Sequence, residues 1–316
     1  VAIAGIGFAV VMVLLQLGFL EAVKITAAIN YDQLDFDVAL VSSEFEQFYD
    51  PGSFPGEWLQ QALDVPGVSA SRPLWARMHL WRCPSYPVDA PVDAPVPELS
   101  ALQRWWLGTK RPRPLQPREL LVLGIDLDRN PFREPIQGQV RAAASRLRLA
   151  DRVLLNAWSN PDFGWNERDQ FHGWELGGRR VQVVGDFTLL RSFGADASVL
   201  TSAANFARAY GLPTPDAAVN FGLIALAPGT STDAVATQLN ARLPAGTQAL
   251  TRDALYRNEA NYWVRQTATG KIFAFGVFVT MIVAAVVVYQ VLSNDIRNRL
   301  PEYATLKAMG NTNRFL

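Results

Sequence analysis

Ile272-Phe-Ala-Phe-Gly-Val-Phe-Val-Thr-Met-Ile-Val-Ala-Ala-Val-Val-Val-Tyr-Gln-Val-Leu292 is a run of 21 residues without a formal charge. A helix rises about 1.5 Å per residue, so such a run is long enough to cross the roughly 30 Å hydrocarbon core of a bilayer. The run therefore predicts a transmembrane helix, and the rest of the chain can be placed relative to it.

The segment after this run reads Asn294-Asp-Ile-Arg-Asn-Arg-Leu-Pro-Glu-Tyr-Ala-Thr-Leu-Lys-Ala-Met-Gly310. In the residues after the run, basic side chains outnumber acidic ones, with Arg297, Arg299, Lys307 and Arg314 against Asp295 and Glu302. An excess of Lys and Arg close to a membrane end marks the cytoplasmic side. We therefore expect the helix to run from the outside to the inside.

A second apolar run, Val1 to Leu20, begins the chain and is followed by Glu21 and Lys24. A cleaved secretory signal is the alternative, but signals carry a basic flank and a shorter apolar core, and the flank is missing here. We expect a retained helix in an inner (plasma) membrane protein of multi-pass type. The predicted division is residues 1–29, first span and stalk; 30–262, extracytoplasmic domain; 263–293, stalk and second span; 294–316, cytoplasmic region.

Composition agrees with this division. The chain has 18% charged and 49% hydrophobic residues, which is the mean expected for two apolar spans together with an ordinary globular domain. The formal net charge is zero, which gives no indication of a nucleic-acid partner. The lone Cys83 has no second cysteine with which to form an intramolecular disulfide. Membrane lipids are thus the first expected partner.

The middle of the chain alternates short strand and helix patterns, which predicts an α+β domain. Expected strands are 36–41, 68–83, 119–126, 152–156, 180–185, 217–226 and 248–251. Expected helices are 55–63, 137–149 and 231–243, the last with Ser231 or Thr232 as N-cap. A hairpin or turn region is expected at 163–178. These elements form two strand-helix-strand units joined through a β-rich insert.

Residues 84–117 differ in kind, since they hold eight of the 20 prolines of the chain. Proline fixes φ and removes a backbone donor, so this stretch should be an extended loop. Basic residues follow its tandem repeat, at Lys110, Arg111, Arg113 and Arg118. Two interpretations stay open, a solvated surface insertion or a docking loop for a partner protein or anionic headgroups.

The residue types that most enzyme mechanisms need are missing at the required spacings. His79 and His172 have no Cys or carboxylate at metal-motif spacing, and neither a nucleophile elbow nor a nucleotide-binding P-loop occurs. The pairs Asp35/Asp37 and Asp126/Asp128 have the spacing of solvated strand ends. We predict no catalytic residue, no cofactor and no metal site, so any ATP hydrolysis must come from another chain.

Over essentially its whole length the chain resembles the permease subunits of FtsX/MacB-type ABC transporters, above all a DevC-like branch found largely in cyanobacteria. The resemblance is carried by Val1-Ala-Ile-Ala-Gly-Ile-Gly-Phe-Ala-Val-Val11, Leu15-Gln-Leu-Gly-Phe19, Gln33-Leu-Asp35, Tyr289-Gln-Val-Leu292 and Leu300-Pro-Glu-Tyr-Ala-Thr-Leu-Lys-Ala-Met-Gly310. It implies a MacB-like periplasmic core domain between the two spans.

The resemblance also implies that the segment after the second span is a coupling helix that binds an ATPase subunit. The residues that match are Leu300, Pro301, Glu302, Tyr303, Leu306, Lys307, Met309 and Gly310. A short helix that begins near Pro301 would bring Tyr303, Leu306 and Met309 within one turn of each other as apolar anchors. Gly310 would end it. An ordinary helix on the inner membrane surface is the alternative.

Further partners implied by the resemblance are a second permease copy in a homodimer, a membrane fusion protein and an outer-membrane channel. The implied activity is mechanotransmission, in which ATP hydrolysis by the partner moves the extracytoplasmic domains and drives export, in DevC-like systems of glycolipid. Members of the family carry four spans, so we expect a chain truncated before two further helices.

Two other functions stay open. Two spans around an extracytoplasmic domain are also the layout of sensory receptors, although residues 293–316 lack the heptads of a signalling helix. A non-transporting FtsX-like regulator of a periplasmic partner is the second alternative.

Overall fold

The computed structural model describes residues 2–82, 117–160, 163 and 174–310. The Pro-rich segment expected to be an extended loop falls almost wholly outside these residues, and so does most of the region expected to be a hairpin at 163–178. The chain forms two compact units, Thr26–Glu259 and the joined ranges Val1–Ile25 and Ala260–Leu316.

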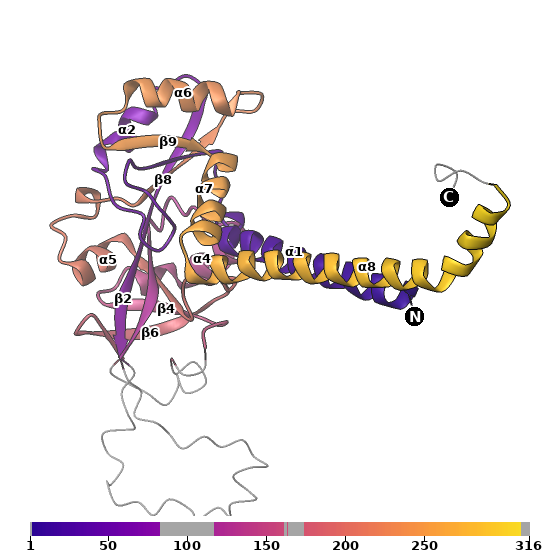
Figure 1. The fold of residues 1–316 in the computed structure, drawn as a ribbon. Coiled ribbons are helices and arrows are strands. Elements are labelled where there is room, and N and C mark those ends of the chain that lie inside the picture. The colour runs from indigo at the N-terminus through magenta and orange to yellow at the C-terminus, as the bar shows by residue number, and fades with distance from the viewer. Residues whose placement is uncertain (1, 83–116, 161–162, 164–173, 311–316) are drawn as a thin grey trace, which may run out of the picture. The chain divides into compact units, whose positions relative to one another are not determined.

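The smaller unit contains most of two long helices, α1 (Ala2–Asp32) and α8 (Ala268–Ala308). Their segments Ile6–Asp32 and Ala268–Glu302 are long and apolar enough to cross a membrane. The helices lie side by side (Figure 1), with the rings of Phe19 and Phe273 6.0 Å apart. A Cβ at Gly276 would meet the Gln16 side chain at 3.2 Å, so glycine permits the close approach.

Large apolar side chains remain exposed along both helices. In α1 these include Phe8, Val11, Leu14 and Phe19, and in α8 they include Ile272, Phe275, Phe278, Met281 and Leu292. Contiguous apolar surface of this extent is unusual on a protein surrounded by water, and it is what a helix facing lipid presents.

The larger unit is built on a nine-stranded sheet with the order β3-β7-β4-β6-β5-β2-β8-β1-β9. Its strands are β1 (Val38–Ser42), β2 (Val68–Arg82), β3 (Arg118–Ile125), β4 (Arg152–Asn156), β5 (Trp174–Leu176), β6 (Arg179–Phe187), β7 (Ser198–Ser202), β8 (Phe221–Leu226) and β9 (Thr247–Thr251). Its helices are α2 (Glu57–Ala62), α4 (Ile136–Leu147), α5 (Ala203–Tyr210), the short 3₁₀ helix η3 (Pro215–Ala217), α6 (Thr232–Arg242) and the start of α7 (Arg252–Arg265).

The long strand β2 divides the sheet into two parts. Along Leu74–Trp81 it pairs with β3, and this extra pairing closes β3, β7, β4, β6, β5 and β2 into a circuit. Along Val68–Leu74 it pairs with β8, which leads to β1 and to the edge strand β9. Residue Leu74 pairs with both neighbours, so the two parts share a continuous backbone.

Helices cover both parts of the sheet. In the first part α4 packs on β4 and β6, and α5 packs on β3 and β7. In the second part α6 packs on β9 and α2 on β2 (Figure 1). The core between them is rich in aromatic rings, and Trp81 and Trp174 stack with their ring centroids 5.3 Å apart.

The expected fold class, two membrane-length helices around an α+β domain, is confirmed. The expected pair of strand-helix-strand units is incomplete, because residues Ser198–Tyr210 add β7 and α5 to one continuous sheet. Ser231 is the N-cap of α6, as expected, and its hydroxyl accepts a hydrogen bond from the Ala234 backbone N–H.

Candidate functional site

The residues predicted to contact an ATPase lie at the end of α8. Leu300 to Lys307 are inside this helix, Met309 is its C-cap, and Gly310 follows with φ +92°. A positive φ at this position is the conformation that ends helices and that glycine adopts without strain. Gly310 therefore has the role expected from the sequence.

Pro301 differs from the expectation. It does not begin a separate short helix, because α8 is continuous from Ala268 to Ala308 and Pro301 lies within it. Proline has no N–H to donate to the carbonyl of Arg297, and its ring crowds that carbonyl, so the helix bends. The Thr305 hydroxyl donates to the Pro301 carbonyl at 2.9 Å, which also favours bending. Figure 1 shows α8 changing direction toward its C-terminal end.

The segment presents its side chains outward. Leu300 is 54% exposed and Met309 is 67% exposed, and Glu302 and Lys307 are exposed without an ion pair among the described residues. Leu306 is half-buried, and the side chain of Tyr303 lies outside the described residues. The structure thus leaves apolar and charged groups of this segment accessible.

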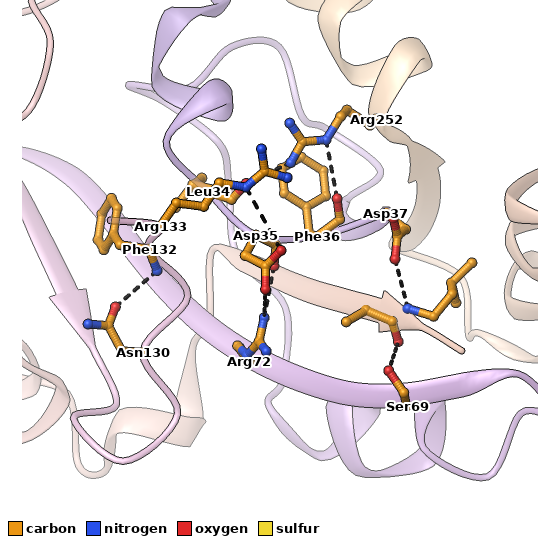
Figure 2. A network of polar contacts seen from close by, with 12 residues as sticks. Leu34, Asp35, Phe36, Asp37, Ser69, Arg72, Asn130, Phe132, Arg133 and Arg252 are labelled. Atoms are coloured by element: carbon orange, nitrogen blue, oxygen red, sulfur yellow. Dashed lines mark hydrogen bonds and ion pairs between the residues drawn. The ribbon is translucent and has the colours of Figure 1, made fainter. Parts of the chain in front are cut away.

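A second cluster, of ion pairs and hydrogen bonds, surrounds the residues that follow α1, and it was not predicted from the sequence. We call Gln33-Leu-Asp-Phe-Asp37 the hub segment. Figure 2 shows Asp35 between two guanidinium groups: Arg72 Nη1 from β2 lies 2.9 Å from Asp35 Oδ2, and Arg133 Nε lies 3.9 Å from Asp35 Oδ1. Arg72 Nη1 also donates to the Asp35 carbonyl at 3.0 Å. This carboxylate therefore ties the hub segment to β2 and to the loop before α4.

Main-chain bonds extend the same connections. The Asp35 N–H donates to the Pro131 carbonyl at 2.8 Å, and the Arg133 N–H donates to the Gln33 carbonyl at 2.8 Å. The Gln33 side-chain oxygen accepts from the Leu190 N–H at 3.1 Å. The hub segment is thus bonded to the loop after β3 and to the loop after β6, both of which belong to the closed circuit.

The second part of the sheet is bonded to the hub segment through Asp37. Its carboxylate accepts from the Leu226 N–H at 2.8 Å (Figure 2). Its own N–H donates to the Ile224 carbonyl at 2.8 Å. Ile224 and Leu226 lie in β8. The five residues of the hub segment therefore contact both parts of the sheet.

Arg252, the first residue of α7, connects the hub segment to the other helix that leads out of the domain. Its guanidinium donates to the carbonyls of Leu34 at 2.6 Å and Phe36 at 3.2 Å, and to that of Tyr31 at 3.4 Å. The guanidinium carbon lies 4.3 Å from the centre of the Phe36 ring, a cation–π distance. One arginine thus satisfies three carbonyl groups at the end of α1.

Buried polar groups join α1 and α7 directly. The Tyr31 hydroxyl donates to Glu259 Oε2 at 2.8 Å, and the Phe48 N–H donates to the same oxygen at 3.0 Å. Tyr31 and Glu259 are both 0% exposed. A buried carboxylate is costly unless hydrogen-bonded, so these donors fix the position of Glu259.

Two further tyrosines surround this contact. Burial raises the pKa of Tyr49, whose hydroxyl accepts from the Asn30 side chain at 2.9 Å. Burial, together with the bond from its hydroxyl to the Asp32 carboxylate, raises the pKa of Tyr256 to about 12. Both phenols are therefore neutral at physiological pH.

The carboxylate pairs noted in the sequence are all occupied by structural bonds. Asp126 accepts from Arg129 Nε at 2.8 Å, and Asp128 pairs with Arg148 at 2.6 Å. Among the described residues no group of three or more His, Cys, Asp or Glu side chains could hold a metal ion. What the hub segment and its partners can do is hold α1, α7 and both parts of the sheet in one bonded network.

Solved structures of other proteins are similar to this chain, and two of them are described here. The periplasmic region of MacB from Actinobacillus actinomycetemcomitans is 7% identical, with a TM-score of 0.41 over 73% of this chain and 96% of that one. The extracellular domain of the noncanonic ABC-type transporter YknZ from Gram-positive bacteria is 10% identical, with a TM-score of 0.38 over 68% of this chain and 99% of that one. No protein-family model and no curated protein matches the chain.

Proposed function

We propose that this chain is a non-catalytic permease subunit of an ABC exporter, placed in the inner membrane with its α+β domain outside the cytoplasm. The observation that carries the proposal is the end of α8. This helix is long and apolar enough to cross a membrane, and it continues without a break into the exposed segment Leu300–Gly310. An exposed helix that ends a span is suited to docking in a groove of another protein.

The hub segment supplies the means by which a displacement would reach the domain. In this proposal the partner ATPase moves the C-terminal segment, and the movement passes along the spans to α1 and α7. The bonds of Tyr31 and Arg252 hold these helices to one another and to the hub segment. Asp35 and Asp37 then distribute the movement to both parts of the sheet. Packed and bonded elements transmit rigid-body shifts in this way.

Finer parts of the proposal follow the sequence resemblance. The subunit would be DevC-like, would form a homodimer, and would work with a membrane fusion protein and an outer-membrane channel. Its cargo would be an amphipathic molecule such as a glycolipid. The residues proposed to bind the ATPase are Leu300, Pro301, Glu302, Tyr303, Leu306, Lys307, Met309 and Gly310.

A pull-down of the full-length native protein by its ABC ATPase subunit tests the proposal. Three proteins are compared with the wild type: Glu302→Lys, a Tyr303/Leu306 double alanine, and Asp295→Lys. Asp295 lies seven residues before Glu302 on α8, outside the proposed binding residues, so it is a control for charge reversal on the same helix. We expect the first two changes to abolish capture and Asp295→Lys to preserve it.

Capture that survives both of the first two changes would contradict the proposal. The segment would then be a helix on the membrane surface, and a two-helix receptor would become the better interpretation. Loss of capture with Asp295→Lys as well would mean that any added positive charge on this part of α8 interferes with capture. That result would contradict the assignment of Glu302 to the ATPase contact.

A further inference from the structure

Three large apolar side chains are exposed at one place on the larger unit. Among the described residues of this unit, six large apolar side chains are exposed, and three of these are Trp158 at 55%, Leu190 at 45% and Phe193 at 48%. Trp158 lies in the loop after β4, and the other two lie in the loop after β6. Together with Arg191, which is also exposed, we call these residues the loop patch.

The buried side chain of Asn156 holds the two loops together. Its Oδ1 accepts from the N–H groups of Trp158 and Leu189, both at 3.1 Å, and its Nδ2 donates to the Leu189 carbonyl at 2.9 Å. Arg191 Nε donates to the Trp158 carbonyl. Asn156 is only 4% exposed, so water competes little for its bonds. The exposed side chains are therefore carried by a backbone that is fixed in place.

The loop patch adjoins the last turns of α1. The Leu190 N–H donates to Gln33 Oε1 at 3.1 Å, directly after the end of this helix. Asn30, which lies within α1, borders the same small cavity as Trp158 and Leu190. Both loops of the patch are thus in the immediate surroundings of α1.

The turn that carries Phe193 is also packed toward α1. It is closed by an antiparallel bridge between Ser192 and Ala195. A Cβ at Gly194 would overlap the Tyr49 ring, so glycine permits this turn to lie against the ring. Tyr49 accepts a hydrogen bond from the Asn30 side chain at 2.9 Å. The position of the turn is therefore set by the same part of α1.

The course of α1 places this region close to the membrane surface. The helix enters the larger unit at Thr26, directly after Ile25, which is 61% exposed, whereas Ala27 and Ala28 are buried. The apolar surface that a bilayer would cover therefore ends near Thr26. Asn30 is only about 6 Å farther along the helix axis, at 1.5 Å per residue. A headgroup layer extends roughly 5–8 Å beyond the hydrocarbon core on each side, so the loop patch is within its reach.

The residue types of the loop patch suit this layer. Tryptophan is enriched where a membrane meets water, because its ring is apolar and its N–H is polar. A guanidinium can bind a phosphate through two parallel hydrogen bonds, and Arg191 is exposed without an ion pair among the described residues. A stable protein interface needs about 20–30 residues a side, so a patch of four residues fits lipid better than a protein.

We propose that the loop patch is a membrane contact of the extracytoplasmic domain. Trp158 and Leu190 lie at the boundary between headgroups and acyl chains, and the Arg191 guanidinium binds a lipid phosphate. The inference rests on the membrane placement in the proposed function and is independent of the ATPase contact. It gives the domain a second attachment to the bilayer beside α1, which orients the domain on the membrane surface.

Quenching by brominated lipid tests this contact. In a Cys83→Ala background, a single cysteine replaces Leu190, Leu149 or Phe8 of the full chain and is labelled with bimane. The labelled proteins are placed in phosphatidylcholine nanodiscs, with and without bromine on the acyl chains near the glycerol. Leu149 is the matched control, because it is 56% exposed and precedes β4, whereas Trp158 follows this strand. We expect bromine to reduce the fluorescence at positions 8 and 190 and to leave position 149 unchanged.

A second measurement tests whether the loop patch acts as a unit. The bimane label is placed on Trp158→Cys, and Leu190→Glu or Leu149→Glu is added. A carboxylate is disfavoured at the boundary with the acyl chains, so Leu190→Glu should remove the quenching at position 158. Leu149→Glu should leave it unchanged. Quenching at position 158 that survives Leu190→Glu would contradict the proposal.

The outcomes separate this inference from the membrane placement. Quenching at position 8 without quenching at position 190 would overturn the contact alone, whereas absence of quenching at position 8 would overturn both. Equal quenching at positions 190 and 149 would also overturn the contact. Circular dichroism and the unfolding midpoint of each labelled protein show that the fold is retained, and Phe193→Cys is a second labelling position if Leu190→Cys lowers that midpoint.

Discussion

Tyr31 and Glu259 lie 228 residues apart in the chain and meet through a hydrogen bond of 2.8 Å, with both side chains fully buried. One belongs to the last turn of α1 and the other to α7. The two helices that leave the domain are thus joined by a charge-assisted bond in a setting where an unpaired carboxylate would be costly.

Tyr31→Phe tests this bond with little change in shape. It removes one donor from a buried carboxylate, so we expect the free energy of unfolding to fall by about 1–3 kcal/mol. Chemical unfolding of the full chain in micelles measures the change. Glu46→Gln, an exposed carboxylate without this environment, should shift it by less than about 0.5 kcal/mol. Equal effects of the two substitutions would show that the bond contributes nothing.

Arg252→Lys tests the connection between α7 and the hub segment. An ammonium cannot satisfy three carbonyl groups in the geometry that a guanidinium allows. We expect faster amide hydrogen exchange at residues 34–37, measured by mass spectrometry. Arg257→Lys, an exposed arginine on the same helix, is the matched control and should leave exchange there unchanged. Unchanged exchange in both variants would show that the bonds of Arg252 do not stabilise the hub segment.

Asn240 closes the free edge of the sheet at β9. Its amide donates to the Ala249 carbonyl at 2.8 Å and accepts from the Ala249 N–H at 2.8 Å, as a neighbouring strand would. Asn240→Ala should cost about 1–3 kcal/mol and expose an unpaired strand edge. Unfolding and light scattering measure the two effects. Thr237→Ala on the same helix should change neither the free energy of unfolding nor the light scattering. An equal loss of stability in Thr237→Ala would show that the effect comes from weakening α6 and not from the bonds of Asn240 to β9.

The pKa of Asp126 predicts how stability depends on pH. Burial acts to raise this pKa, but the Arg129 guanidinium and the N–H groups of Asp128 and Arg129 outweigh it, so the pKa lies below its ordinary value of 3.8. A lowered pKa in the folded state stabilises the fold above pH 3.8, and this contribution is lost as pH falls further. Asp126→Asn should therefore flatten the acid limb of a stability profile measured down to pH 2. An unchanged limb would contradict the assignment.

The regular elements of the domain were predictable where local patterns are strong. The strands at 119–126 and 152–156 and the helix capped by Ser231 agree with β3, β4 and α6. β7 and α5 were missed because no turn residue separates them. Ser202 ends the strand and is at the same time the N-cap of the helix, accepting from the Asn205 N–H. The signal was a serine three residues before an asparagine, which is weak by itself.

The network around the hub segment could not be predicted from the sequence. Asp35 and Asp37 had the spacing of solvated strand ends, and no sequence motif singled out Glu259. Their roles depend on partners far away in the chain, such as Arg72 and Leu226. Long-range pairing of this kind leaves no mark on local periodicity. The C-terminal residues were proposed from the sequence alone, and their contact with an ATPase stays a prediction; Pro301 lies within α8 and does not begin a separate helix.

Photo-crosslinking in native membranes tests the central claim most directly. A benzophenone side chain is placed at Met309 of the full-length protein, and the same group at Asn298, which is also exposed on α8, is the control. The proposed function predicts a protein adduct at position 309 that contains a nucleotide-binding P-loop, absent at position 298. Lipid adducts alone at position 309, or the same adducts at both positions, would contradict it.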